Sequence, residues 1–280
     1  MLKQRVLTAV VLLAVLGGVM SAQSPWPFFI FLSITCGLAG WEWTRLTLPH
    51  SKIWPLTIGS LLCLLTLTQA FAWLNLSLTS VIWVQLSAII SVLIWLICVS
   101  RALFVAQVHS PSAAAGWTFF AFITLFATWG ILALLFKEQG MVYVASLLAL
   151  IWIADIAAYF VGRAVGRRKL APAISPGKTI EGALAGVIGV VVWVLLTAQW
   201  PESFGAMLIT KWGTLSTVFL SVLLAVFSIC GDLFESMLKR RAGVKDSSHL
   251  LPGHGGVYDR IDAVVAVVPL AYLLTADVFS

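Results

Sequence analysis

Six of the eleven acidic residues in this chain are candidates for one site, because they lie in apolar segments or at their ends, where a carboxylate is costly unless it is paired or coordinated. They are Asp155, Glu181, Asp232, Glu235, Asp259 and Asp262. Asp155 interrupts an apolar run and has no basic residue closer in sequence than Arg163. Asp232 follows Gly231 inside another apolar run. These placements favour one common site over isolated structural roles, with Asp232 as a metal ligand.

Helical spacing groups these acids further. Asp232, Glu235 and Lys239 are three and four residues apart and share one helical face, as do Asp259 and Asp262. A salt bridge with Lys239 is an alternative role for Glu235. Asp259 and Asp262 could also simply complement the positive end of the last predicted helix.

Basic residues accompany the acids in two long polar segments, residues 162–179 and 239–257. Hard divalent cations such as Mg²⁺ prefer oxygen ligands, usually one or two carboxylates together with substrate phosphates. Lysine and arginine neutralise the remaining phosphate charge. The pattern therefore predicts a site for phosphates.

The sequence "SPGKT", residues 175–179, is predicted to contact phosphate through Ser175, Lys178 and Thr179. It precedes a predicted helix, where backbone N–H groups without partners attract anions. A P-loop is excluded, because Pro172 occupies the place of its first glycine and no apolar strand precedes the motif.

Gly255 and Gly256 precede the last apolar segment and permit close approach of the backbone to a ligand. His254 beside them is a candidate phosphate contact, although a lone loop histidine is usually structural or solvated. The remaining substrate-binding candidates are basic: Arg240, Lys245 and Arg260. The predicted catalytic residues are Asp232, Lys239, Asp259 and Asp262.

The composition indicates an all-α integral membrane protein, since 61% of the 280 residues are hydrophobic, 10% are charged and the mean hydropathy is +1.03. About nine transmembrane helices are expected, near Leu2–Met20, Pro27–Trp43, Ile53–Phe71, Leu76–Val99, Trp117–Phe136, Val142–Val161, Ile180–Trp200, Leu215–Cys230 and Val257–Phe279. The first could be a signal peptide, but the later apolar spans favour a retained helix. Residues 24–27 could make the first two a re-entrant hairpin. We expect residues 1–136 to form about five helices and residues 137–280 to carry catalysis.

The basic residues predict the orientation of these helices. With a cytoplasmic N-terminus, all but Lys137 and Lys211 of the seventeen fall in cytoplasmic loops. The multi-pass chain should therefore present its site to the cytoplasm. Its net charge of +6 requires no nucleic-acid partner. The four cysteines lie in apolar stretches without CxxC or His–Cys spacing, which indicates neither a zinc site nor a disulfide framework.

Residues 236–262, "SMLKRRAGVKDSSHLLPGHGGVYDRID", resemble the signature of the phosphatidate cytidylyltransferase (CDP-diacylglycerol synthase) family. The resemblance extends to "WIADIAAYFVGR", "SPGKTIEG" and, more loosely, "WEWTRL". The chain departs from the family at Gly177, where a basic residue is common, and at Ile180, where an aromatic one is common.

The resemblance implies a polytopic, homodimeric enzyme of a bacterial-type inner membrane that makes CDP-diacylglycerol and pyrophosphate from CTP and phosphatidate. It implies Mg²⁺, with K⁺ as the candidate second ion. Asp232 and Asp259 match the family's metal ligands, Asp155 is a further candidate, and Lys239 matches a characteristic lysine. Asp262 would orient Arg260 or a metal-bound water. Because a lipid phosphate is already anionic, charge neutralisation and placement would suffice for the reaction.

Three alternatives remain on the sequence alone. A polyprenyl-phosphate sugar-phosphate transferase usually has adjacent aspartates, and this chain has no Asp-Asp pair. A lipid-alcohol kinase would also use magnesium and a nucleotide. A secondary transporter would place its acids near the middle of the membrane rather than at helix ends.

Overall fold

The computed structural model describes residues 2–75, 81–106, 108 and 114–276, and its chain folds into two compact units. Unit 1 comprises residues 1–91, 109–137 and 238–261. Unit 2 comprises residues 92–108, 138–237 and 262–280. Each unit is therefore assembled from separate stretches of sequence.

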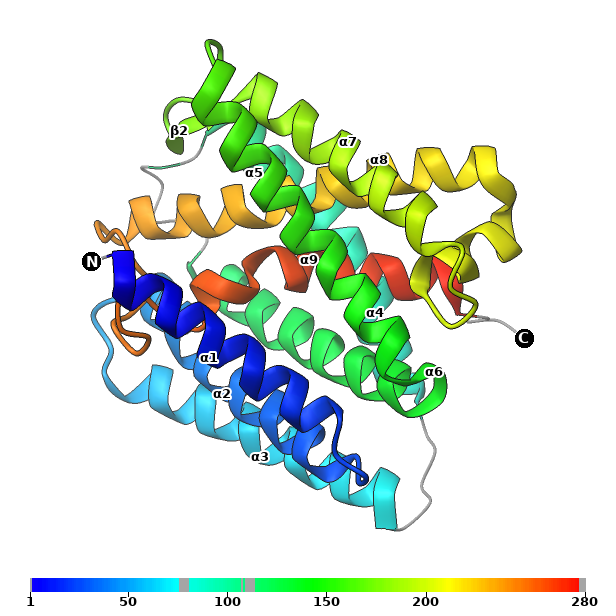
Figure 1. Cartoon of the computed structure of the whole chain (residues 1–280). Helices are drawn as coiled ribbons and strands as arrows, with labels where there is room; N and C mark the ends of the chain where they lie inside the picture. Colours follow the sequence, from blue (N-terminus) through cyan, green and yellow to red (C-terminus); the bar gives the residue numbers. More distant parts are fainter. Residues whose placement is uncertain (1, 76–80, 107, 109–113, 277–280) are drawn as a thin grey trace. The chain divides into compact units, whose positions relative to one another are not determined.

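The N-terminal helices of unit 1 are α1 (Leu2–Met20), α2 (Trp26–Thr47) and α3 (Ile53–Asn75), which lie side by side in Figure 1. Glycines allow α2 and α3 to pack closely. A Cβ atom at Gly37 would lie 2.8 Å from the Cβ of Cys63 and 2.9 Å from the carbonyl oxygen of Gly59. This packing holds α2, which carries Glu42 near its C-terminal end, against α3.

The remaining elements follow in chain order. They are α4 (Ile82–Ile94), the π-helix η1 (Trp95–Val99), α5 (Ser100–Phe104), α6 (Ala114–Val165), β1 (Lys169–Ala171), β2 (Ser175–Thr179), α7 (Ile180–Thr197), α8 (Phe204–Arg241) and α9 (Tyr258–Thr275). Positive φ angles interrupt two of these helices, at Gly140 (φ 84°) in α6 and at Gly213 (φ 75°) in α8. The break at Gly140 separates the two helices predicted near residues 117–136 and 142–161.

A short antiparallel hairpin of β1 and β2 occupies the polar segment that the sequence presented as a loop. Lys169 pairs with Thr179 in its register. The Thr179 hydroxyl then accepts a hydrogen bond from the backbone N–H of Gly182 at 3.2 Å. Thr179 is therefore the N-cap of α7, which explains why the helix begins at Ile180.

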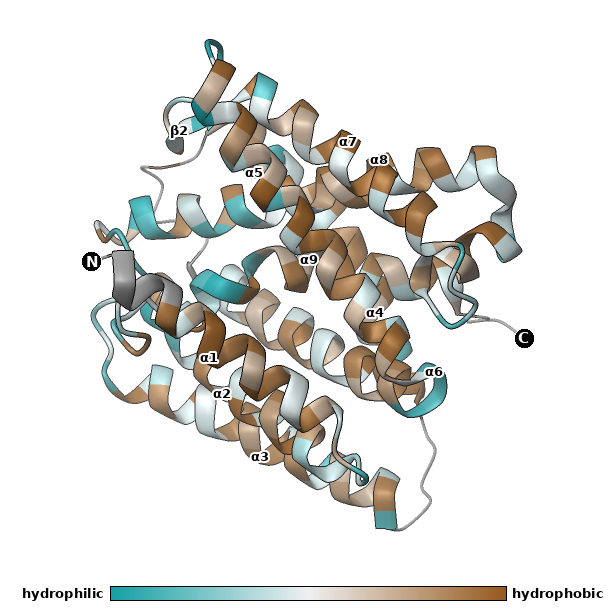
Figure 2. Cartoon of the chain, viewed as in Figure 1, coloured by the Kyte–Doolittle hydropathy of each residue, from teal (hydrophilic) through white to brown (hydrophobic). Residues whose placement is uncertain are grey.

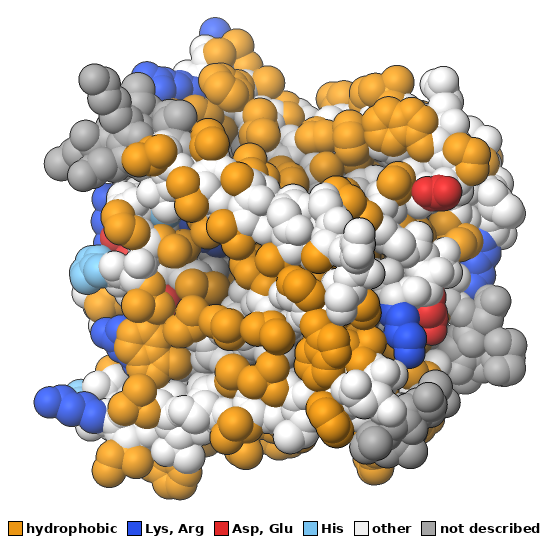
Figure 3. Space-filling view, turned by 60° about the horizontal axis from the view of Figure 1, so that its bottom comes forward, with side chains coloured by type: hydrophobic (Ala, Val, Ile, Leu, Met, Phe, Trp, Pro, Cys, Tyr) orange, Lys and Arg blue, Asp and Glu red, His pale blue; other side chains and the backbone are white. Residues whose placement is uncertain are grey.

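The all-α membrane fold is confirmed, since helices dominate and apolar residues run along them (Figure 2). In the described part of the chain, five helices are long and apolar enough to cross a membrane: Ile53–Asn75, Ile82–Phe104, Ala115–Val165, Ile180–Thr197 and Phe204–Arg241. Hydrophobic side chains cover much of the face drawn in Figure 3. The nine crossings stay a prediction, and residues 76–80 and 277–279 of the predicted spans lie outside the described residues.

Candidate functional site

Three carboxylates of unit 2 meet in an acidic cluster formed by Asp232, Glu235 and Asp262. One oxygen of each lies within 4.8 Å of the others. Glu235 is buried, and the other two are half-buried. Like charges this close repel one another, so a cation is the natural partner of the group.

Local geometry explains how α8 and α9 bring these side chains together. Asp232 and Glu235 are three residues apart on α8 and share a face. Gly231 lets α9 approach that face, because a Cβ atom there would lie 2.6 Å from the carbonyl oxygen of Asp262 and 2.9 Å from the Cα of Ala263. The missing side chain of Gly231 therefore sets the distance between Asp232 and Asp262.

Replacing Gly231 with alanine should force α8 and α9 apart and cost about 1–3 kcal/mol of stability through overpacking. We expect a lower Tm in detergent and a loss of whatever function the acidic cluster performs. Gly17→Ala is the matched control, since a Cβ atom at Gly17 meets nothing within 4 Å. An unchanged Tm in Gly231→Ala would show that α8 and α9 can accommodate the added methyl group without a loss of stability.

Basic and acidic side chains of unit 2 surround the cluster. Lys178 of β2 forms an ion pair with Asp232, with both side chains less than one-third exposed. Asp155 of α6 is close enough to Asp262 to repel it electrostatically. The sequence predicted Lys178 and Asp155 as site residues in separate segments, and both lie near the cluster.

Asp259, in unit 1, has its carboxylate enclosed by donors. Its Oδ1 accepts a hydrogen bond from the Lys239 Nζ at 2.8 Å. Its Oδ2 accepts from the backbone N–H of Gly256 at 2.7 Å and from that of Ser247 at 3.0 Å, and the Ser247 hydroxyl oxygen lies 3.0 Å from it. Only 4% of the Asp259 side chain is exposed. The predicted pairing of Asp232 and Asp259 on one metal stays a prediction, and Glu235 and Asp262 are the acids placed beside Asp232.

A second enclosed carboxylate of unit 1, Glu42 on α2, was absent from the predicted site. It is completely buried. Its Oε1 accepts hydrogen bonds from the Ser248 hydroxyl at 2.5 Å and the Val257 N–H at 3.0 Å. Its Oε2 accepts from the Tyr258 N–H at 2.6 Å and the Ser247 hydroxyl at 3.0 Å. The sequence signal for it was an acid near the end of the apolar span predicted at Pro27–Trp43.

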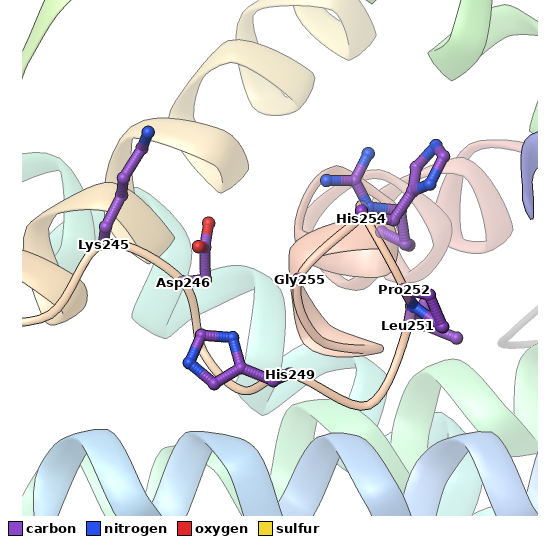
Figure 4. A pocket seen from close by; sticks show the side chains of 9 residues that line it. Lys245, Asp246, His249, Leu251, Pro252, His254 and Gly255 are labelled. Carbon is purple, nitrogen blue, oxygen red and sulfur yellow. The ribbon is translucent and has the colours of Figure 1, made fainter. Parts of the chain in front are cut away.

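A polar pocket of about 530 Å³ lies in unit 1. It is lined by Lys245, Asp246, His249, Leu251, Pro252, Gly253, His254, Gly255 and Arg260. Figure 4 shows Lys245 and Asp246 on one side of this pocket and His254 on the other, with His249 below them. Its lining has two cations and two imidazoles against one carboxylate, that of Asp246, so its basic groups suit an anion. His249 was not among the site residues predicted from the sequence.

The other predicted site residues lie outside the acidic cluster. Gly255 and Gly256 pack against carboxylates, since a Cβ atom on the first would collide with Asp259 and one on the second with Glu42 and Ser247. Arg240 is exposed near the end of α8, and Ser175 is half-buried at the start of β2. Thr179 uses its hydroxyl to cap α7. Nucleotide contact by these residues stays a prediction.

Comparison with known proteins gives a consistent result over the whole chain. Residues 3–277 match the model of the cytidylyltransferase family. The chain is similar to the phosphatidate cytidylyltransferase of Haemophilus influenzae, at 36% identity over 286 residues that cover 96% of both chains. It is similar to the protein of that name in Pseudomonas aeruginosa, at 35% identity with 96% of this chain and 95% of the relative covered. The Bacillus subtilis relative of that name is 33% identical over 282 residues, with 98% of both chains covered.

Proposed function

Because the chain belongs to the cytidylyltransferase family, we propose that it makes CDP-diacylglycerol and pyrophosphate from CTP and phosphatidate. It is a membrane nucleotidyltransferase. Relatives that match it over nearly their full length are named phosphatidate cytidylyltransferase, which is the name for an enzyme of this reaction. In the structure, the acidic cluster beside Lys178 is the observation that carries the proposal. Transfer between two highly charged phosphates requires such a site.

The reaction is a displacement at phosphorus. An oxygen of the phosphatidate phosphate attacks the α-phosphorus of CTP and forms a new P–O bond. The bond from that phosphorus to the oxygen bridging to the β-phosphate breaks, and pyrophosphate leaves with the electron pair. Because the attacking phosphate monoester is already anionic, no side chain has to remove a proton from it. The protein has to neutralise charge and hold the reactants in line.

The family suggests a divalent metal requirement, and the acidic cluster fits Mg²⁺. Carboxylate oxygens are its preferred protein ligands. One oxygen from each of the three carboxylates lies within 4.8 Å of the others, so the three could share one cation. When bound, Mg²⁺ would neutralise phosphate charge and make the α-phosphorus more electrophilic. Asp232, Glu235 and Asp262 would hold it, with Asp155 as a further ligand and K⁺ as the candidate second ion.

The other charged residues then act on the substrates. Lys178 holds Asp232 in place and adds positive charge beside it. Lys239 is held by Asp259, so its ammonium group is fixed for contact with a phosphate. In the polar pocket, Lys245, His254 and Arg260 would bind the triphosphate of CTP. Asp259 could join a metal only by giving up hydrogen bonds to these partners.

The setting of the enzyme follows from its charges. The basic residues and the acids gather in segments predicted to lie on one side of the membrane, so we place the active site and the N-terminus in the cytoplasm of a bacterial-type inner membrane. Residues 137–280 would carry most of the catalytic groups, and two copies would form a homodimer.

Replacing Arg260 with glutamine should raise the KM for CTP about 10-fold to 100-fold, because a charge-assisted hydrogen bond to phosphate contributes about 1.5–3 kcal/mol. The rate at saturating CTP should fall much less. Arg101→Gln, which removes an exposed arginine outside the polar pocket, is the matched control. A KM for CTP within twofold of the wild type in Arg260→Gln would remove the polar pocket from nucleotide binding.

The function itself can be tested with two lipids. The purified chain in detergent micelles, supplied with CTP, Mg²⁺ and phosphatidate, should release one pyrophosphate for each CDP-diacylglycerol that mass spectrometry detects. Diacylglycerol in place of phosphatidate should yield no product. Phosphorylation of diacylglycerol without pyrophosphate release would identify a lipid kinase and overturn the proposal.

A further inference from the structure

Glu42 is a buried carboxylate that the proposed mechanism does not use. It lies on an apolar helix and is completely buried, which is costly for a charged group unless hydrogen bonds compensate. Four donors from residues 247–258 approach its two oxygens, two donors to each oxygen. A carboxylate meets this requirement fully, because each of its oxygens can accept two hydrogen bonds.

The four donors belong to the two ends of one loop. The hydroxyls of Ser247 and Ser248 lie at its start, and the N–H groups of Val257 and Tyr258 lie at its end. The residues between them supply most of the lining of the polar pocket. Val257 directly precedes α9 and Tyr258 begins it, at a helix end where N–H groups lack helical partners and a negative charge is favourable. One side chain of α2 therefore closes the loop and caps the following helix.

The same contacts extend to Asp259. The Ser247 hydroxyl lies 3.0 Å from the Glu42 Oε2 and 3.0 Å from the Asp259 Oδ2. The backbone N–H of Gly256 donates to Asp259, while the Cα of Gly256 packs so closely that a Cβ atom would collide with Glu42 and Ser247. Trp43, the next residue on α2, stacks on Tyr258 with ring centroids 4.7 Å apart. The orientation of Asp259 is thus set through groups that Glu42 holds.

We infer that Glu42 is a positioning residue for the reaction, which fixes Asp259 and the polar-pocket loop through Ser247 and the first turn of α9. It touches neither substrate. Its kinetic consequence rests on the proposed function, whereas its effect on the loop does not.

Glu42→Gln tests the inference with almost no change of volume. The glutamine amide keeps one accepting oxygen. Its NH₂ group would stand where the second carboxylate oxygen was, and would face two hydrogen-bond donors that then lack an acceptor. We expect amide hydrogen exchange in residues 247–258 to accelerate about 10-fold, because the loop loses its closure. We expect kcat to fall about 100-fold, the typical effect of misplacing a catalytic group by about 1 Å. Ser247→Ala should reproduce part of both effects.

Ser33→Ala is the matched control. Ser33 is buried on the same helix; it accepts a hydrogen bond from the Trp129 indole at 3.0 Å and donates one to the Phe29 carbonyl oxygen at 2.9 Å, and neither partner belongs to the loop. It should lower the Tm, leave exchange in residues 247–258 unchanged and keep kcat within about threefold. The double variant Glu42→Gln with Ser247→Ala should lose no more than Glu42→Gln alone, because both changes break one chain of contacts.

Two outcomes would overturn the inference. One is wild-type exchange in residues 247–258 of Glu42→Gln together with a kcat within threefold. The other is a loss of kcat in the double variant that equals the product of the losses in the two single variants, which would show that Glu42 and Ser247 act independently. If the wild-type chain makes no CDP-diacylglycerol, the proposed function fails, and the exchange experiment still decides whether Glu42 positions the loop.

Discussion

Replacing Asp232 with asparagine should lower the rate of CDP-diacylglycerol formation by about 1000-fold or more. Asp232 is the member of the acidic cluster that also pairs with Lys178, so the change removes a ligand for the cation and frees a lysine at once. Loss of one strong electrostatic contact in a transition state commonly costs about 100-fold to 1000-fold. The initial rate in mixed micelles, with CTP saturating and Mg²⁺ varied, measures the effect.

Glu202→Gln provides a charge-matched control, because Glu202 is exposed in the turn before α8. It should keep the rate within about twofold. Asp262→Asn should shift the Mg²⁺ dependence in the same direction as Asp232→Asn, since both carboxylates would share the cation. A rate near that of the wild type in Asp232→Asn would exclude the acidic cluster from catalysis.

Asp259→Asn should reduce the rate about 100-fold to 1000-fold for a different reason. The asparagine oxygen can replace only one of the two carboxylate oxygens, so either Lys239 or the donors of Ser247 and Gly256 lose an acceptor. A buried charge without its partner costs about 3–5 kcal/mol, and Lys239 would move. Initial rates and the Tm in detergent, measured together, separate the loss of function from a loss of folding.

Lys239→Met should give a loss of similar size, and the double variant should not be worse than the more damaging single change. Lys137→Met is the control for removing a lysine of the same unit, since Lys137 is exposed and donates to the carbonyl oxygen of Trp73 at 3.3 Å. Its rate should remain within about threefold. Wild-type rates in Asp259→Asn would show that the Lys239–Asp259 pair has only a structural role.

Local sequence patterns account for part of this fold and site. Hydropathy and length indicated which segments are helical. The break between two predicted spans falls at Gly140, whose positive φ angle of 84° interrupts α6. The spacing of Asp232 and Glu235 placed them on one face of α8, because helix periodicity alone determines that relation. The β1–β2 hairpin escaped notice, since three and five residues give too little alternation to indicate a strand.

Contacts distant in sequence could not be predicted in this way. Glu42 and its donors are more than 200 residues apart, and no local pattern records that they meet. The Gly255–Gly256 pair suggested close approach to a ligand, whereas the structure shows close approach to Asp259 and Glu42. A sequence can show that a position requires glycine. Which side chain packs against that glycine depends on the tertiary structure.

The most direct test of cytidylyl transfer from CTP to phosphatidate is to follow a ³²P label placed at the α- or the γ-phosphate of CTP. The purified chain should transfer ³²P from [α-³²P]CTP to lipid when phosphatidate and Mg²⁺ are present, and the label of [γ-³²P]CTP should appear only in pyrophosphate. That result requires attack at the α-phosphorus, as cytidylyl transfer demands. Lipid labelled by [γ-³²P]CTP, or no labelled lipid from either nucleotide, would contradict the account.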